Sequence, residues 1–269
     1  MTEQFVSIER AETPLGQRVA IVRFDTGSKA NALSQELMRQ LTAAARSFEG
    51  DADTNAIILT GRADRFCLGM DLKDPEFQTA LDLPLNERRQ LLQLGPRMCK
   101  AWEDLEPMTI CAIEGWCVGG GVALAASLDL RVCSRSSQFY IPEIERGLNM
   151  SWGSLPRIAG LIGPARTKRL TIIAEQINAE TAENWGWVDY IAEDGMAMGK
   201  AISVADKIAA MPPVAVRMIK QGIETATKPL NRAVSATDMD QFALMQSSTD
   251  HAEGVASFLE QRDAKFTGG

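Results

Sequence analysis

Short, continuously apolar runs recur along the first half of the chain, and each has the length of one strand. Residues 56–60 and 109–113 have the unbroken apolar character of strands that are buried on both faces of a parallel sheet. Further strands are predicted at 6–10, 19–24, 129–133, 138–141 and 188–191, with a turn at 14–16 between the first two.

Helical periodicity separates these runs and dominates after Ser151. Ser34 can cap the first helix, residues 85–105 form another with a break near Gly95-Pro96, and residues 75–83 are irregular. An apolar helix is predicted at 122–128, and residues from 193 to 266 are almost wholly helical. Strands that alternate with helices, followed by helices alone, predict an α/β core over 1–195 and a C-terminal helical region over 196–269. The boundary is soft, because these helices can pack back on the core or on a neighbouring subunit.

The composition is that of an ordinary globular protein and disfavours several classes of function. The 269 residues are 45% apolar and 23% charged, enough for one large core with a helical appendage. A net charge of −7 without a basic block gives no general attraction to nucleic acid or to an anionic membrane. We find no secretory signal in the first residues and no apolar run of about 18 residues, so a cytoplasmic location is expected.

The number and spacing of the cysteines and histidines exclude or disfavour further kinds of site. The cysteines are odd in number and form no CxxC pair, which predicts reduced and mostly buried thiols at positions 67, 99, 111, 117 and 133. His251 is the one histidine of the sequence, so a histidine metal cluster is excluded. A hydrolytic triad is disfavoured because no Gly-x-Ser-x-Gly segment supplies its nucleophile. His251 is expected at the surface or at a helix start.

Two glycine-bearing turns, at 65–73 and 114–121, carry the candidate chemistry. Each follows an apolar run, and the second opens into a helix whose first N–H groups are free to point at a ligand. The run Gly119-Gly120-Gly121 matches neither a dinucleotide-binding fingerprint nor a P-loop. Together the turns can direct two backbone N–H groups at one oxygen, as an oxyanion hole does when it stabilises an enolate. Glu143, after Pro142, is placed to move protons.

These motifs resemble the crotonase superfamily (enoyl-CoA hydratase/isomerase). The resemblance covers essentially the whole chain, and the order and spacing of the motifs are specific although each is loose alone. The matching segments are residues 31–33, 66–73, 115–121, 139–143, 182–189 and 257–262.

The resemblance implies a crotonase-like spiral of ββα units with a C-terminal helical trimerisation region, hence a homotrimer or a homohexamer made of two trimers. It implies an acyl-CoA substrate, no metal, and no cofactor apart from the coenzyme A of the substrate. The oxyanion would lie between the amides of Met70 and Gly120. The remaining substrate and coenzyme A contacts implied are Arg65, Phe66, Leu68, Gly69, Asp71, Lys73, Gly119, Ala123, Ser151 and, from a neighbouring subunit, Phe258 and Arg262.

The acidic residues depart from the pattern of the family's hydratases, which carry two glutamates. The first position is Ala123 here, the second is Glu143, and a position that is aspartate in some members is Ser151. Hydration uses one group to activate water and another to deliver a proton, whereas one base suffices to shift a double bond from position 3 to position 2. The leading prediction is therefore isomerisation or hydration of an enoyl-CoA, with Glu143 as the single acid/base.

Two other functions stay open. Hydroxycinnamoyl-CoA hydratase-lyases have similar turns and a single glutamate, but they grip the substrate with a C-terminal tyrosine that is missing near residues 238–240. The loss of one glutamate also suits a catalytically silent acyl-CoA-binding protein, although retention of Glu143 argues against it. A dehalogenase is disfavoured because Ser151 replaces its aspartate nucleophile. Trp116, Met150 and Trp152 would favour a bulky or aromatic acyl chain, or else simply pack in the core.

Overall fold

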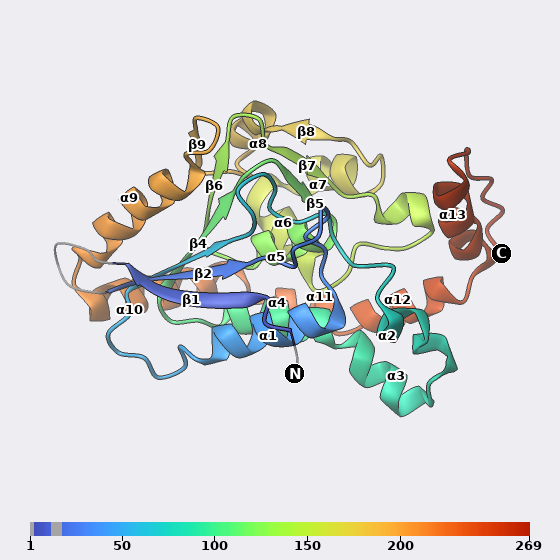
Figure 1. The fold of residues 1–269 in the computed structure, drawn as a ribbon, viewed down its shortest axis with the longest axis horizontal. Helices are drawn as coiled ribbons and strands as arrows, with labels where there is room; N and C mark the ends of the chain where they lie inside the picture. Colours follow the sequence, from blue (N-terminus) through green and yellow to red (C-terminus); the bar gives the residue numbers. More distant parts are fainter. Residues whose placement is uncertain (1–2, 12–17) are drawn as a thin grey trace.

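A six-stranded sheet runs through the middle of the molecule in the computed structural model, which describes residues 3–11 and 18–269 (Figure 1). Its first two strands pair antiparallel and all later neighbours pair in parallel. The predicted turn at 14–16 lies outside the described residues. In spatial order the strands are β1 (Val6–Ala11), β2 (Val19–Phe24), β3 (Ala56–Thr60), β4 (Met108–Ile113), β6 (Leu130–Ser134) and β9 (Tyr190–Ala192).

A second, three-stranded sheet carries the later turn of the candidate site. It consists of β5 (Trp116–Val118), β7 (Gln138–Tyr140) and β8 (Ile177–Asn178). Neither β5, which lies within the predicted turn at 114–121, nor β8 is predicted from the sequence, because strands of three and two residues give too little periodicity to recognise.

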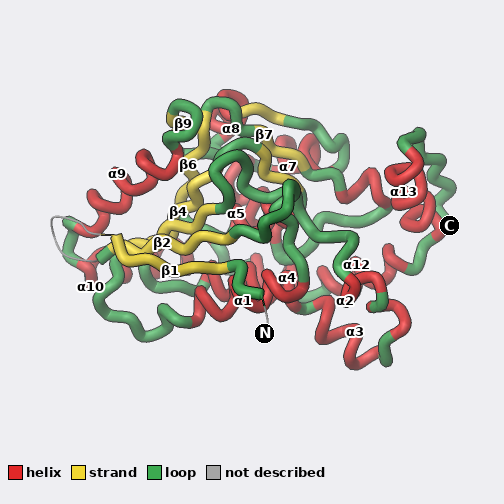
Figure 2. Tube along the Cα trace, viewed as in Figure 1, coloured by secondary structure: helices red, strands yellow, loops and turns green. Residues whose placement is uncertain are grey.

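Helices cover both faces of the six-stranded sheet. Up to residue 185 they are α1 (Gln35–Arg46), α2 (Pro75–Gln78), η1 (Ala80–Asp82), α3 (Leu85–Leu92), α4 (Leu94–Glu103), α5 (Gly120–Ala126), η2 (Glu143–Arg146), α6 (Ser154–Ile162), α7 (Pro164–Thr171) and α8 (Ala179–Trp185). The later ones are α9 (Ala197–Ala209), α10 (Pro213–Thr227), α11 (Asn231–Ser235), α12 (Asp238–Gln246) and α13 (Thr249–Glu260). Figure 2 shows the strands in the centre, with α9 and α10 at one end of the molecule and α13 at the other.

The strands are buried on both faces, as their unbroken apolar runs predict. Ile57 and Leu59 of β3 belong to the large core that they share with Leu37 of α1. Ile58 points to the opposite face, where α9 packs through small residues such as Ala201. The first helix beyond the predicted boundary at residue 195 therefore packs back on the sheet.

Several local predictions are confirmed. Ser34 caps α1 by accepting the N–H of Leu37, as predicted. His251 lies in the first turn of α13, in agreement with its predicted place at a helix start, and Ser248 caps this helix by accepting the N–H of His251. All five cysteines are buried free thiols, and burial raises the pKa of each of them.

Two local predictions are wrong, and a third, a helix break, is displaced by two residues. Residues 75–83 contain α2 and η1, because Asp74 caps a helix that has Pro75 in its first turn. The helix break falls at Gln93 rather than at Gly95-Pro96. The last helix ends at Glu260, where Gln261 adopts the left-handed conformation, and residues 261–269 are not helical.

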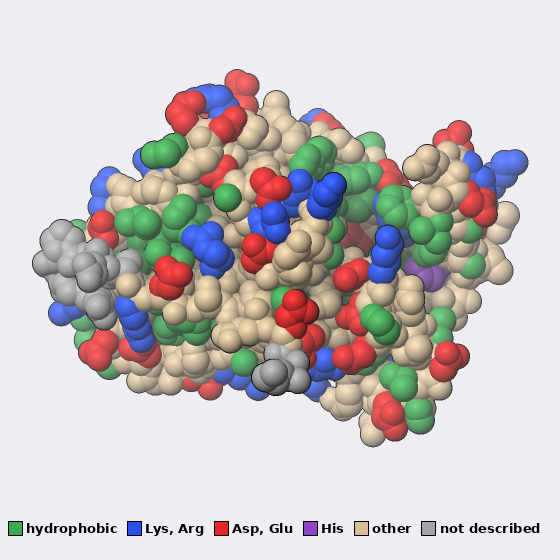
Figure 3. Space-filling model, viewed as in Figure 1, with side chains coloured by type: hydrophobic (Ala, Val, Ile, Leu, Met, Phe, Trp, Pro, Cys, Tyr) green, Lys and Arg blue, Asp and Glu red, His purple; other side chains and the backbone are tan. Residues whose placement is uncertain are grey.

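Charged side chains of both signs are interspersed over the face in Figure 3, with apolar patches between them. Among the described helices, none combines the length and the apolarity that crossing a membrane requires.

Candidate active site

The first glycine-bearing turn lies between two other backbone segments. On one side Leu33 donates its N–H to the carbonyl of Gly69 and accepts the N–H of Asp71. On the other side Cys67 pairs with Cys117 in a parallel bridge. Leu33 is thus hydrogen-bonded to Gly69 and Asp71, the residues on either side of Met70. The N–H of Met70 therefore points away from Leu33.

The second turn passes close to the first. A Cβ added at Gly69 would lie 3.1 Å from the carbonyl oxygen of Val118 and 3.6 Å from the nitrogen of Gly120. Gly69 itself has φ +92°, which other residues rarely adopt. Within the described chain, neither the Met70 N–H nor the Gly120 N–H donates to a protein acceptor. Two unpaired amides are thus brought together, and a buried amide without a partner calls for a ligand or a water.

Glu143, the first residue of η2, lies directly against the second turn. A Cβ added at Gly119 would lie 2.5 Å from Oε1 of Glu143, so a glycine is required for the carboxylate to sit there. Glu143 Oε2 is buried and has no hydrogen-bond partner among the described residues. Burial raises the pKa of Glu143 to about 7, while a hydrogen bond from its own backbone and the charge of Arg146 act in the opposite direction. The carboxyl group can therefore both accept and donate a proton near neutral pH.

Helix α13 packs against the turn that carries Glu143. A Cβ added at Gly254 would lie 2.6 Å from the backbone of Arg146, and His251 Nδ1 is 2.7 Å from the Arg146 carbonyl oxygen. The Arg146 guanidinium lies 4.2 Å from the ring centre of Phe258. The C-terminal helix thus supports the candidate acid/base from within the same chain.

An apolar recess adjoins Met70 and has almost no free volume. Its lining residues are Gln35, Met38, Met70, Leu91, Leu92, Gly95, Trp152, Met239 and Phe242. Gln35 Oε1 is buried there without a hydrogen-bond partner among the described residues. Gln35 is not predicted as a site residue from the sequence, since a glutamine that opens a helix carries no signal of its own.

The predicted residues at the start of the first turn have unequal access to a ligand. Phe66 is fully buried in edge contact with Phe24, and its N–H and C=O are already bonded, which argues against direct contact with coenzyme A. Leu68 and Arg65 are half-buried, and Arg65 pairs with Asp64. Lys73 is exposed and follows Asp71, which accepts the Lys73 N–H.

Two predicted positions, at which the resemblance implies carboxylates in related enzymes, are neutral and buried here. Ala123 lies in α5 and Ser151 precedes Trp152, both within the core. Across residues 3–11 and 18–269, no group of three or more His, Cys, Asp or Glu side chains is arranged to hold a metal ion.

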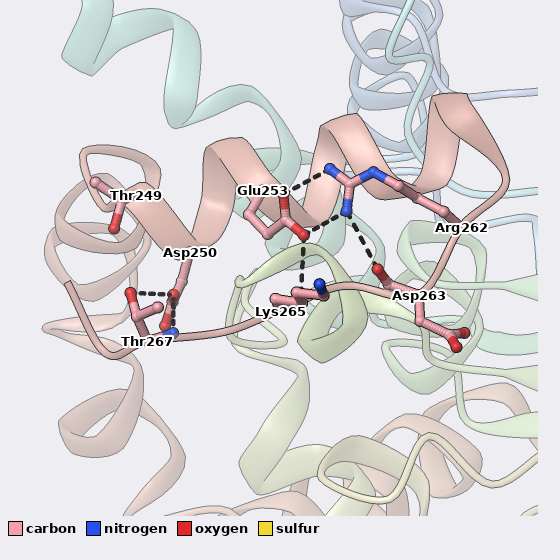
Figure 4. A pocket seen from close by; sticks show the side chains of 7 residues that line it. All are labelled: Thr249, Asp250, Glu253, Arg262, Asp263, Lys265 and Thr267. Carbon is pink, nitrogen blue, oxygen red and sulfur yellow. Dashed lines mark hydrogen bonds and ion pairs between the residues drawn. The ribbon is translucent and has the colours of Figure 1, made fainter.

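Arg262 and Phe258 are not brought to the paired amides by this chain alone. Arg262 binds Glu253 and Glu260 in a polar recess between α13 and the C-terminal tail (Figure 4). The tail is tied to the helix by Asp250, which accepts the N–H groups of Thr267 and Gly268.

Asn31, which belongs to the motif at residues 31–33, holds the first turn in place. Its Nδ2 donates to the carbonyl oxygens of Phe66, at 2.9 Å, and Phe24, and its Oδ1 accepts the N–H of Thr26. Gly61 leaves room for this contact, because a Cβ there would lie 2.3 Å from the Phe66 carbonyl oxygen. Asn31 is a positioning residue: it acts on the candidate site through the backbone that leads to Met70.

Comparison with known proteins identifies the family. The sequence profile described as Enoyl-CoA hydratase/isomerase matches residues 15–269. A short-chain-enoyl-CoA hydratase of Clostridium acetobutylicum is 28% identical over 246 residues, covering 91% of this chain and 92% of that protein. A 1,2-epoxyphenylacetyl-CoA isomerase of Escherichia coli is 31% identical over 245 residues, covering 88% and 90%.

Solved structures agree with this result. The crystal structure of an enoyl-CoA hydratase from Mycobacterium avium subsp. paratuberculosis has the same fold, with a TM-score of 0.85 over 98% of this chain and 99% of that one, at 18% identity. The predicted superfamily and α/β fold are therefore confirmed. The chain belongs to the enoyl-CoA hydratase/isomerase family and is an enzyme that acts on an acyl-CoA thioester.

Proposed function

We propose that this enzyme moves a proton next to the thioester carbonyl of an enoyl-CoA and shifts its double bond, with Glu143 as the single acid/base. The observation that carries the proposal is the Glu143 carboxyl group, beside two unpaired amides. Its Oε2 is buried without a partner in the described chain, and its pKa is raised to about 7. Such a group is suited to proton transfer rather than to stabilising the fold.

The proposed reaction needs no group beyond those of the site. The N–H groups of Met70 and Gly120 bind the thioester oxygen. The Glu143 carboxylate removes a proton from carbon 2 of a 3-enoyl thioester, and the electron pair of that C–H bond moves into a dienolate whose negative oxygen the two amides stabilise. Glu143 then returns the proton to carbon 4, and the product is the 2-enoyl thioester. Metal and redox cofactors take no part in these steps.

Hydration is the second reaction that the family background supports, and Ala123 argues against it. In this position a second carboxylate would help to hold the attacking water, and the side chain here is a methyl group. A panel of 2-enoyl-, 3-enoyl- and hydroxycinnamoyl-CoA, analysed by mass spectrometry and NMR, separates the outcomes. We expect an isobaric shift of the double bond on 3-enoyl-CoA. A gain of water as the dominant reaction would replace isomerase by hydratase, and release of an aldehyde would indicate a lyase.

The pH dependence follows from the raised pKa of Glu143. The ionised carboxylate is the base, so kcat/KM for 3-enoyl-CoA should rise as the pH increases through about 7 and level off above it. Initial rates at substrate concentrations well below KM measure this profile. A profile that stays flat down to about pH 5, where an ordinary glutamate remains ionised, would contradict the assignment of the base.

We further propose that coenzyme A is held by Arg65, Leu68 and Lys73 at the edge of the first turn, and by Phe258 and Arg262 of a neighbouring subunit. The exposed ammonium group of Lys73 can bind a phosphate as a point charge. The five buried, reduced thiols support a cytoplasmic location for the enzyme.

A homotrimer, or a homohexamer of two trimers, is the proposed assembly. It is supported by large apolar side chains that the single chain leaves exposed on and after α10: Val214, Met218, Ile219, Ile223, Leu230 and Val234. Sedimentation velocity should give three or six times the mass of the 29.3 kDa chain. Ile223→Glu should reduce this mass, whereas Leu85→Glu, at an exposed site on α3, should not. A wild-type monomer at micromolar concentration would rule the assembly out.

A further inference from the structure

The indole ring of Trp152 fills the space between Gly95, which lines the apolar recess, and Gly120 of the second turn. A Cβ added at Gly95 in α4 would lie 2.1 Å from the indole Cε2. A Cβ added at Gly120 would lie 2.8 Å from Cζ3 on the far edge of the same ring. The indole thus occupies the side-chain space of Gly95 and covers the residue whose amide is proposed to bind the thioester oxygen.

The backbone of Trp152 is fixed by polar contacts on both sides. Residues other than glycine rarely adopt a backbone φ of +63°, so the surrounding structure must impose this conformation on Trp152. Arg157 Nη1 donates to the Trp152 carbonyl oxygen at 2.8 Å, and Asp238 Oδ2 accepts the next N–H, that of Gly153, at 2.7 Å. Arg157 is itself held by two bonds to Glu103, of 2.8 and 2.9 Å. The indole is therefore anchored in the recess and is not a mobile surface group.

The recess next to this ring has almost no free volume. About 10 Å³ remains among its lining side chains, which is on the order of one water molecule. Those lining side chains are mostly apolar and include Met70, so the recess is where the apolar end of an acyl group would extend from the paired amides. A chain longer than the reacting carbons meets the anchored indole there.

We propose that Trp152 is a specificity-determining residue that restricts the acyl group to short chains of butyryl or crotonyl size. The inference rests on the proposed function, because it places the thioester at Met70 and Gly120. It reverses the expectation that Trp152 favours a bulky acyl group. The ring occupies the volume that additional methylene groups would need, so removing it opens the recess to them.

Binding of a ladder of saturated thioesters tests this inference without depending on turnover. Butyryl-, hexanoyl-, octanoyl- and decanoyl-CoA are titrated by isothermal calorimetry into the wild type, Trp152→Ala and Trp152→Leu. We expect wild-type affinity not to increase beyond butyryl-CoA. In Trp152→Ala it should increase with chain length, at most roughly fourfold for each methylene group that becomes buried. Trp152→Leu, which retains an apolar side chain, should lie between the two.

The matched control is Trp185→Leu, which removes a tryptophan from α8, outside the lining of the recess. Its length dependence should equal that of the wild type. Equal binding of butyryl- and decanoyl-CoA by the wild type, or an unchanged length dependence in both folded Trp152 variants, would overturn the role of Trp152 and leave the proposed function standing. Failure of all four thioesters to bind would overturn the proposed function itself.

A second measurement checks the position of the ring and does not require any ligand. Gly95→Ala should lower the Tm of the wild type, because its methyl group collides with the indole. The same substitution in the Trp152→Ala background should be neutral or stabilising, since alanine favours a helix interior over glycine. Equal effects in the two backgrounds would mean that the indole does not occupy this space, and would overturn the inference.

Discussion

Glu143→Gln is expected to lower turnover of enoyl-CoA by about 10²- to 10⁴-fold, the usual contribution of a general acid/base, without unfolding the protein. Glutamine has nearly the same shape as glutamate and still fits against Gly119, but it cannot accept the proton from carbon 2. The measurement is kcat on 3-enoyl-CoA, with circular dichroism to verify the fold. Glu145→Gln, at an exposed carboxylate two residues along the same turn, is the matched control and should stay within a few-fold of the wild type.

The same substitution should stabilise the protein at neutral and higher pH. Burial raises the folded-state pKa of Glu143 from its usual 4.5 to about 7, so the folded state favours the protonated carboxyl group. The stability that this preference contributes is fully present below about pH 4.5 and is lost as the pH rises through 7. Glutamine avoids that loss, and we expect a gain of roughly 1–3 kcal/mol in the free energy of unfolding at about pH 8. Wild-type turnover in Glu143→Gln, or a lower Tm at this pH, would contradict the proposed role.

Gly119→Ala is the second substitution with a large expected effect, because it acts on the position of the carboxylate. The new methyl group would lie 2.5 Å from Glu143 Oε1, so the carboxyl group must move away from the paired amides. A displacement of about 1 Å can cost about 10²-fold in rate. Gly119 has φ +50° and ψ −114°, outside the left-handed helical region, and this conformation adds about 1–3 kcal/mol of strain for any residue with a Cβ. Kinetics on 3-enoyl-CoA and denaturant unfolding of the same preparation measure the two effects.

The control for this substitution is Gly160→Ala in α6, where no atom lies within 4 Å of the added Cβ. It should leave the rate unchanged and stabilise the helix by up to about 1 kcal/mol. An equally active Gly119→Ala would mean that Glu143 does not need its observed position, and the proton-transfer proposal would then lose its geometric basis.

The parts of the fold that the sequence predicts are those with strong local signals. Residues 56–60 form β3 as predicted because four consecutive buried apolar residues followed by a buried threonine admit few other structures. Ser34 at the start of α1 was recognisable because its side chain satisfies an N–H within its own segment. The two strands β5 and β8 are imposed by pairing with β7, a contact between segments far apart in sequence that no local pattern records.

In the candidate site, too, residue types could be predicted from the sequence, whereas contacts between distant segments could not. Gly119 and Glu143 were recognisable as residue types in a motif, but the contact between them depends on how η2 packs over the second turn. Trp152 gave only an ambiguous signal, since its role depends on Gly95 and Gly120 leaving space for one ring. Phe66 was expected at a ligand because it belongs to the motif, and the structure places its side chain in the core instead.

Exchange of the carbon 2 protons of butyryl-CoA in D2O, followed by proton NMR, tests the central claim most directly. A saturated thioester can be neither isomerised nor hydrated, so the measurement isolates enolate formation by the paired amides and Glu143. We expect the wild-type enzyme to exchange these protons for deuterium and Glu143→Gln to do so at least about 10²-fold more slowly. Binding of butyryl-CoA without exchange in the wild-type protein would show a silent acyl-CoA-binding protein and would contradict the proposed mechanism.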